Sequence, residues 1–89
     1  MANNFRDFSV QKSISPAGST AVITNTNTTN DESRSIYIGV ADDYDFYVDG
    51  SWITFKNTID GSVLPIRARG ARHTTGSTAP DSGDVIFLY

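Results

Sequence analysis

The chain has 89 residues, a formal net charge of −3 at pH 7 and no cysteine, so it has room for one hydrophobic core and cannot form disulfides or thiolate metal sites. This acidity argues against nucleic-acid binding, which normally uses a basic domain, and against an anionic membrane surface. Ser, Thr, Asn and Gly supply more than a third of the chain, which favours β structure and turns. The first residues do not resemble a signal peptide, and no apolar run approaches the ~18 residues of a membrane span.

The N-terminal residues 1–15 are predicted to form an arm. Phe5 and Phe8 stand among polar neighbours there, without the sustained period of a strand or a helix. Such a segment orders on contact with a partner. The rest of the chain, residues 16–89, is predicted to be a single β domain.

Two segments with opposite character open this domain. Residues 19–24 are a short β-branched run that predicts a strand. Residues 25–32 contain no hydrophobic side chain, so they cannot fill a core and are predicted to be a solvent-exposed loop.

The middle of the chain predicts one strand and then a hairpin. Residues 35–40 alternate apolar and other side chains, which predicts a strand. Residues 44–48 and 51–56 also alternate, and Asp49-Gly50 joins them, which is the strongest short-range hairpin pattern. A two-residue turn places Tyr47 opposite Trp52, on the face away from the core. The predicted core face of the hairpin carries Tyr44, Phe46, Val48, Ile53 and Phe55.

The last third of the chain predicts two more strands. Residues 63–69 place Leu64, Ile66 and Ala68 on one face, and Pro65 suits an edge of a sheet. Residues 70–83 are polar and rich in breakers, which predicts a loop, and residues 84–89 form the last strand. The predicted fold is all-β, a small antiparallel β-sandwich or barrel of about six to seven strands. Its predicted core is Ile36, Ile38, Phe46, Ile53, Phe55, Leu64, Ile66, Ile86 and Leu88.

The titratable residues do not form a recognisable catalytic or metal-binding pattern. The aspartates at positions 42, 43, 45 and 49 do not fit the spacing of a calcium loop. His73 is the sole histidine, and the sequence gives it no evident nucleophile or orienting carboxylate. The sequence also lacks the nucleophile-elbow and phosphate-loop motifs. The chain is therefore predicted not to be an enzyme and to need no metal or cofactor.

Two features are candidates for an interface. The first is the exposed pair Tyr47 and Trp52, which is either a stabilising surface pair, an anchor between subunits or a platform for a sugar ring. The second is a contrast of charge between the aspartates of residues 42–49 and a basic group. These opposed patches either join neighbouring subunits of a ring head to tail or are ordinary solvated strand ends. The basic group is Arg67, Arg69 and Arg72.

Four short motifs occur in a fixed order along residues 34–89. They are IYIGV at residues 36–40, TFKN at 54–57, DGSVLPIR at 60–67 and VIFLY at 85–89. In these motifs the chain resembles the spike-base (head-spike base) proteins of tailed phages and gene transfer agents. It departs from that pattern in the loop of residues 74–83, and residues 1–33 match it only loosely.

The resemblance implies a structural protein of the virion, assembled in the bacterial host cytoplasm. Such a protein forms a homo-oligomer, here expected to be a pentameric ring with a trimer as the alternative. It attaches a spike or receptor-binding fibre to the capsid, at the vertices in the gene-transfer-agent members, so the expected partners are the capsid protein and the spike or fibre protein. The arm around Phe5 and Phe8 would bind the capsid or a neighbouring subunit. The alternatives are a tail-tip or baseplate adaptor, a capsid decoration protein and a small carbohydrate-binding module.

Overall fold

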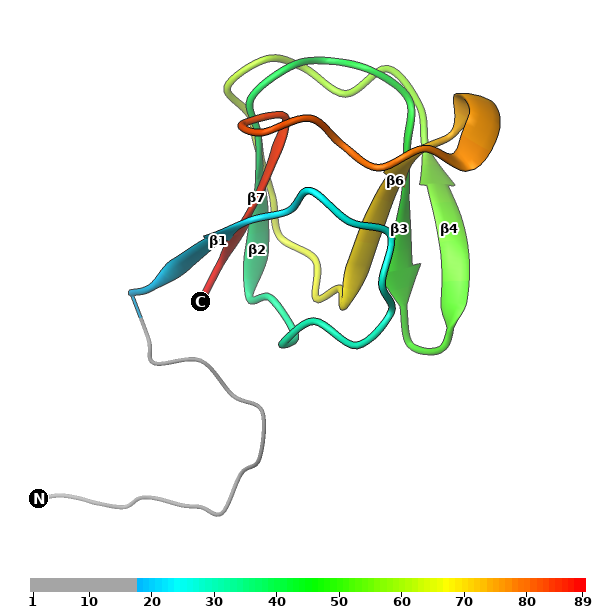
Figure 1. Ribbon diagram of the computed structural model, residues 1–89. Helices are drawn as coiled ribbons and strands as arrows, with labels where there is room; N and C mark the ends of the chain where they lie inside the picture. The colour runs from blue at the N-terminus through cyan, green and yellow to red at the C-terminus, as the bar shows by residue number, and fades with distance from the viewer. Residues whose placement is uncertain (1–17) are drawn as a thin grey trace, which may run out of the picture.

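The computed structural model describes residues 18–89, so Phe5, Phe8 and the rest of the predicted arm lie outside the described residues. Within residues 18–89 the chain forms seven strands and one short 3₁₀ turn, η2 (Thr75–Ser77). The strands make two antiparallel sheets that face each other, as Figure 1 shows. The predicted fold class, a small antiparallel β-sandwich, is therefore confirmed.

One sheet has four strands and the other has three. The four-stranded sheet has the order β1 (Thr20–Val22), β7 (Val85–Leu88), β2 (Ser35–Ile38) and β5 (Val63–Leu64). The three-stranded sheet has the order β4 (Ser51–Phe55), β3 (Tyr44–Val48) and β6 (Gly70–His73). The chain crosses from one sheet to the other several times, so each sheet combines segments that are far apart in the sequence.

The hairpin β3–β4 has the register that the sequence predicts. Val48 pairs with Ser51 and Tyr47 pairs with Trp52. The two turn residues have positive backbone angles, φ 51° at Asp49 and φ 84° at Gly50. Positive φ at both central residues defines the type I′ turn, whose twist matches that of the two strands.

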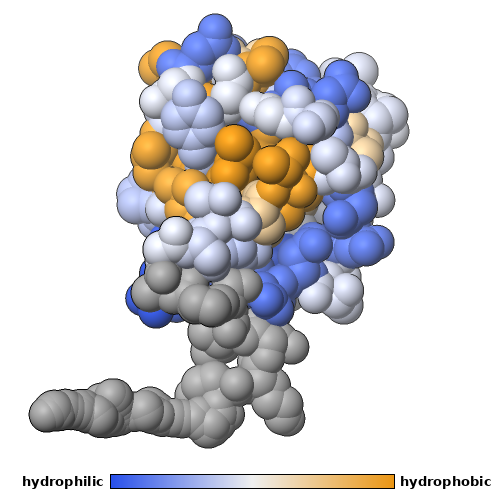
Figure 2. Space-filling model, turned by 60° about the vertical axis from the view of Figure 1, so that its left-hand side comes forward, coloured by the Kyte–Doolittle hydropathy of each residue, from blue (hydrophilic) through white to orange (hydrophobic). Residues whose placement is uncertain are grey.

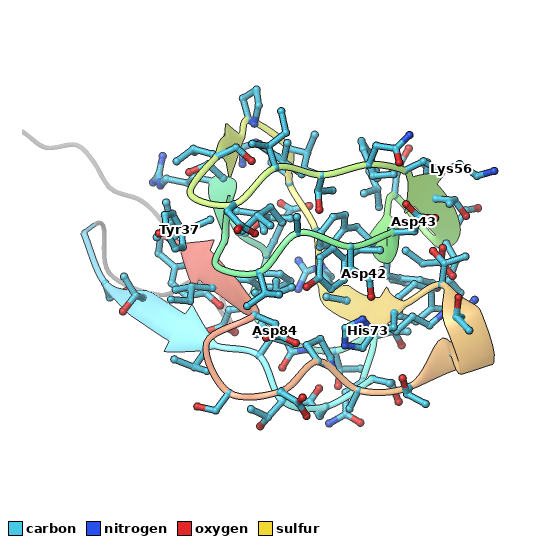
Figure 3. All side chains as sticks on the ribbon, turned by 90° about the horizontal axis from the view of Figure 1, so that it is seen from above. Tyr37, Asp42, Asp43, Lys56, His73 and Asp84 are labelled. Carbon is cyan, nitrogen blue, oxygen red and sulfur yellow. The ribbon has the colours of Figure 1, made fainter. Side chains whose placement is uncertain are left out.

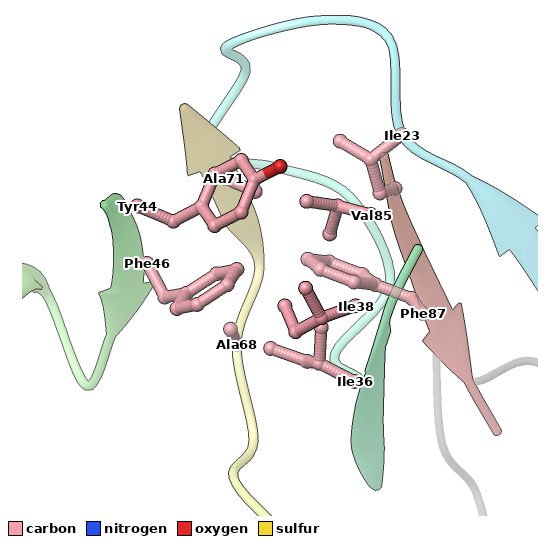
Figure 4. Close-up of a cluster of buried hydrophobic side chains, with 9 residues drawn as sticks. All are labelled: Ile23, Ile36, Ile38, Tyr44, Phe46, Ala68, Ala71, Val85 and Phe87. Carbon is pink, nitrogen blue, oxygen red and sulfur yellow. The ribbon is translucent and has the colours of Figure 1, made fainter. Parts of the chain in front are cut away.

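The core lies between the two sheets, and Figure 4 shows its side chains. Ile36, Ile38 and Phe46 lie in it, as predicted. Phe55, Leu64 and Ile66 pack against it and are partly buried. The buried cluster consists of Ile23, Ile36, Ile38, Tyr44, Phe46, Ala68, Ala71, Val85 and Phe87.

Three predicted core positions are wrong. Ile86 and Leu88 lie on the outer side of β7, whose buried residues are Val85 and Phe87. All four residues of β7 are apolar, so the sequence contains no alternation that would show which face is buried. Ile53 is 44% exposed, because β4 is an edge strand of the three-stranded sheet.

Strand β6 lies where the sequence predicts a loop. Its residues pair with β3, and Ala71 points into the core opposite Phe46. A strand with one small apolar residue between glycine and polar neighbours gives no periodic signal.

The predicted strand over residues 63–69 ends early, at Leu64. Beyond Pro65, the backbone of residues 66–68 forms hydrogen bonds with the buried side chain of Ser33. The Ser33 hydroxyl donates to the carbonyl of Ile66 and accepts from the amide of Ala68.

Candidate functional site

The outer side of the four-stranded sheet carries a row of apolar side chains. Successive residues of a strand point to opposite faces, so the neighbours of the buried Ile36 and Phe87 point outward. The register places Val22 beside Ile86, Ile86 beside Tyr37, and Tyr37 beside Val63. This row crosses all four strands. Together with Leu88, which lies one row further along β7, it forms a surface that we call the apolar face: Val22, Tyr37, Val63, Ile86 and Leu88.

The apolar face is open to solvent. Val22 is 48% exposed and Val63 is 54% exposed, while the other three side chains are half-buried. The residues that continue the row of Leu88 are Thr20 and Ser35, which are uncharged. Figure 2 shows a hydrophobic area on the side of the molecule that carries this sheet. A contiguous apolar area of this kind is typical of a site that binds another protein. The sequence does not predict this surface, because the predicted core includes Ile86 and Leu88.

The outer side of the three-stranded sheet holds the predicted aromatic pair. The rings of Tyr47 and Trp52 meet edge to face, with centroids 5.2 Å apart. The indole also reaches β6, where the guanidinium carbon of Arg72 lies 4.1 Å from its ring centroid. A Cβ atom on Gly70 would lie 3.2 Å from the Trp52 ring and 2.5 Å from the carbonyl oxygen of Asn27. The aromatic pair therefore packs within its own sheet, and its role as an anchor or sugar platform stays a prediction.

Beside this pair, a buried carboxylate connects all three strands of the sheet. Asp45 on β3 accepts a hydrogen bond from the Nε of Arg72 on β6 at 2.9 Å. The hydroxyls of Thr54 on β4 and Thr74 after β6 donate to its other oxygen, each at 2.7 Å. Burial by itself raises the pKa of Asp45, but the hydrogen bonds from Thr74, Thr54 and Arg72 outweigh it and hold the pKa below its usual value of 3.8.

This contact changes the predicted pattern of opposed charge patches. The predicted acidic patch contains Asp45 and the predicted basic group contains Arg72, but these two residues pair with each other inside one subunit. Arg67 and Arg69 remain exposed. Arg67 lies 3.8 Å from Glu32, and Arg69 donates to the carbonyl of Asn30 at 3.4 Å. Asp45 and Arg72 are therefore not available for the predicted head-to-tail contact between the charge patches of neighbouring subunits.

We expect Asp45→Asn to lower the free energy of unfolding by about 2 kcal/mol at pH 7, in the range for hydrogen bonds to charged groups. The asparagine oxygen can still accept from both threonines, but its amide group would face the Nε–H of Arg72, and two donors repel each other. Urea denaturation followed by circular dichroism measures the difference. Asp49→Asn is the matched control: that residue is exposed in the turn at positive φ, which asparagine tolerates well, so its expected change is close to zero.

The same contact predicts a pH dependence. Because the pKa of Asp45 is lower in the folded chain, its stabilising effect is complete above about pH 4, the ordinary aspartate pKa, and is lost as the pH falls through the folded value. The difference between the unsubstituted chain and Asp45→Asn should shrink steadily below pH 4. A difference that persists unchanged at pH 2 would contradict an ionic role for Asp45.

His73 lies between two carboxylates, which the sequence did not predict. Its Nδ1 is 2.7 Å from Asp42 and its Nε2 is 3.4 Å from Asp84, as Figure 3 shows from above. Its ring also packs on Tyr44, with centroids 5.1 Å apart. A backbone hydrogen bond at Asp43 and the hydrogen bond with His73 lower the pKa of Asp42. The cluster thus fastens β6 to the segment after β2 and to the turn before β7.

Other groups around this cluster are also engaged by the protein itself. Tyr44 donates its hydroxyl to the carbonyl of Val40 at 2.6 Å, and burial raises the pKa of Tyr44 to about 12, so the phenol stays protonated. Asp43 accepts from the backbone amide of Asn57 at 2.8 Å. No group of three or more side chains in residues 18–89 is placed to hold a metal ion.

No protein-family model, curated protein or solved structure matches the chain. In the described part of the chain, no helix has the length and apolar character to cross a membrane.

Proposed function

We propose that the chain is a structural subunit that assembles with copies of itself and attaches a spike or fibre to a phage-like particle. The observation that carries this proposal is the apolar face, which crosses every strand of one sheet and contains no charged residue. Burying such a face against another protein is favourable, at roughly 25 cal/mol per Å² of apolar surface. The resemblance of residues 34–89 to spike-base proteins supports a place at the base of a spike, with the capsid protein and the spike or fibre protein as partners.

We prefer a closed ring of copies to a twofold dimer, in which the apolar face would pair with the same face of a second copy. The face lies on one side of the domain, so a different surface of the next copy must cover it in a closed ring, and such head-to-tail contacts generate cyclic symmetry. A domain of this size also has a small core and gains stability from neighbouring subunits. A pentamer is our preferred ring and a trimer is the alternative.

The structural alternatives use the same surface, because a tail-tip adaptor or a decoration protein would also assemble through it. A carbohydrate-binding module has less support. The guanidinium of Arg72 already lies over the indole of Trp52, and a sugar ring would have to displace it to stack on that side.

Native mass spectrometry of the tag-free chain over a range of concentrations tests the assembly. We expect a discrete oligomer, and we expect Val63→Glu to raise the concentration needed for assembly at least tenfold, because a buried carboxylate would have no partner. Ile53→Glu is the matched control, since Ile53 is similarly exposed but lies on the other sheet. A stable monomer at all concentrations would contradict self-assembly, and a stronger effect of Ile53→Glu would move the interface to β4.

The place in the particle needs a separate measurement. We expect the chain to copurify with particles through a density gradient, at a fixed ratio to the major capsid protein. Complete recovery in the soluble fraction, apart from particles, would contradict a virion role while leaving self-assembly intact.

A further inference from the structure

The apolar face is narrow compared with an ordinary interface between globular proteins. Its row of four side chains spans three strand spacings of about 4.8 Å, or roughly 14 Å, and Leu88 adds one further position along β7. A stable interface between folded domains usually buries about 800 Å² on each partner. A strip of this shape fits an extended segment with a few apolar side chains better than it fits a second flat surface.

The chain itself contains a short apolar segment that suits this strip. Phe5, Phe8 and Val10 lie within six residues of the arm. Side chains of an extended segment alternate between its two sides, so Phe8 and Val10 share one side and Phe5 lies on the other. Phe8 and Val10 are therefore the pair that faces the strip, and a phenylalanine can bury roughly 150–250 Å².

The charges of the arm and of the domain are complementary. The arm carries Arg6 and Lys12 against a single acidic residue, Asp7, whereas acidic side chains outnumber basic ones in residues 18–89. An arm with a positive balance is attracted to an acidic domain, and this attraction favours encounter between the two.

The attachment of the arm favours a neighbouring copy over its own domain. The described chain begins at Gly18, whose amide donates to the carbonyl of Tyr89, and then runs along β1 toward Val22. The chain thus enters β1 at Thr20, the end that lies away from Val22 in the apolar row, so an arm that continues in this direction leads away from its own row. A contact from the arm of one copy to the face of the next is also head to tail, as a ring requires.

We propose that residues 5–10 of one subunit bind across the apolar face of the next subunit and so form the joint of the oligomer. This inference rests on the proposed self-assembly and identifies the two surfaces that carry it. Phe8 and Val10 would lie on the row from Val22 to Val63.

Disulfide trapping tests this joint cleanly, because the chain has no cysteine of its own. Arg6→Cys places a thiol on the side of the extended arm that Phe8 and Val10 share and keeps the apolar residues, and Val63→Cys places one at the end of the row. The two single variants are unfolded together, refolded as a mixture and oxidised, and the products are read by intact mass spectrometry. We expect a disulfide between the two variants. The matched control replaces Val63→Cys with Ser51→Cys, which is exposed on the other sheet, and should give at least tenfold less cross-linked product.

The other outcomes separate this inference from the proposed function. If the double variant Arg6→Cys/Val63→Cys forms an internal disulfide while the mixed single variants do not cross-link, the arm covers its own face and the inference is overturned. A discrete oligomer by native mass spectrometry with no disulfide in either experiment would also overturn it, yet would leave self-assembly standing. A monomer without any cross-link would overturn both. Phe8→Ala/Val10→Ala provides a second readout, because it should raise the concentration needed for assembly at least tenfold.

Discussion

Phe87→Ala is expected to lower the free energy of unfolding by about 3–5 kcal/mol, the range for removing a buried phenylalanine side chain. Phe87 lies on the central strand β7, is fully buried and pairs with Ile36 and Ala21 of the two neighbouring strands. Its removal leaves a cavity between the sheets, which rigid strands on both sides cannot close. For a domain this small, a loss of that size is a large share of the typical total of about 5–15 kcal/mol.

The neighbouring residue provides the control. Leu88→Ala removes a similar apolar group from the outer side of the same strand, so we expect a loss of about 1 kcal/mol or less in the dissociated chain. Both variants should be compared with the unsubstituted chain by urea denaturation at one low protein concentration, because assembly adds to apparent stability. Equal losses for the two variants would contradict the register of β7.

Gly39→Ala is the second substitution with a large expected effect, a loss of about 3 kcal/mol or failure to fold. Gly39 follows β2, and its amide donates to the carbonyl of Asp84 at 2.8 Å. A methyl group on Gly39 would overlap the backbone carbonyl oxygen of Gly83. Neither backbone can move aside easily, because this crossing joins the end of β2 to the turn that leads into β7.

Gly50→Ala separates this steric effect from the general cost of replacing a glycine. Gly50 has φ 84° and open space around its Cα, with no atom within 4 Å of an added Cβ. We expect a loss of about 1–2 kcal/mol there, from the positive φ alone. Thermal denaturation of the two variants side by side measures the contrast. A smaller loss for Gly39→Ala than for Gly50→Ala would contradict the close approach of the two segments.

The hairpin shows how much local sequence can determine. A two-residue turn with Asp49-Gly50 fixes which residues pair, and alternation fixes which side chains share a face. The register of β3 with β4 and the pairing of Tyr47 with Trp52 follow from these neighbouring residues. Ile36 and Ile38 likewise follow from the alternation of their own strand.

The candidate site could not be predicted in the same way. The apolar face exists because β7 lies between β1 and β2 and turns Ile86 outward, and four consecutive apolar residues carry no local sign of that orientation. Asp45 meets Arg72 across 27 positions of sequence, and His73 meets Asp42 across 31. Such contacts depend on which strands become neighbours.

By itself, the sequence therefore determined the strands with clear alternation, the tight turn and the class of the fold, because these depend on interactions between nearby residues. The tertiary structure alone decided which face of β7 is buried, that residues 70–73 join a sheet, and which charges pair. Those features arise when both sheets close over one core. The free energy gained by burying Phe87, Phe46 and their neighbours favours a single packing of the two sheets. Residues with weak local preferences, such as those of β6, then adopt the conformation that this packing requires.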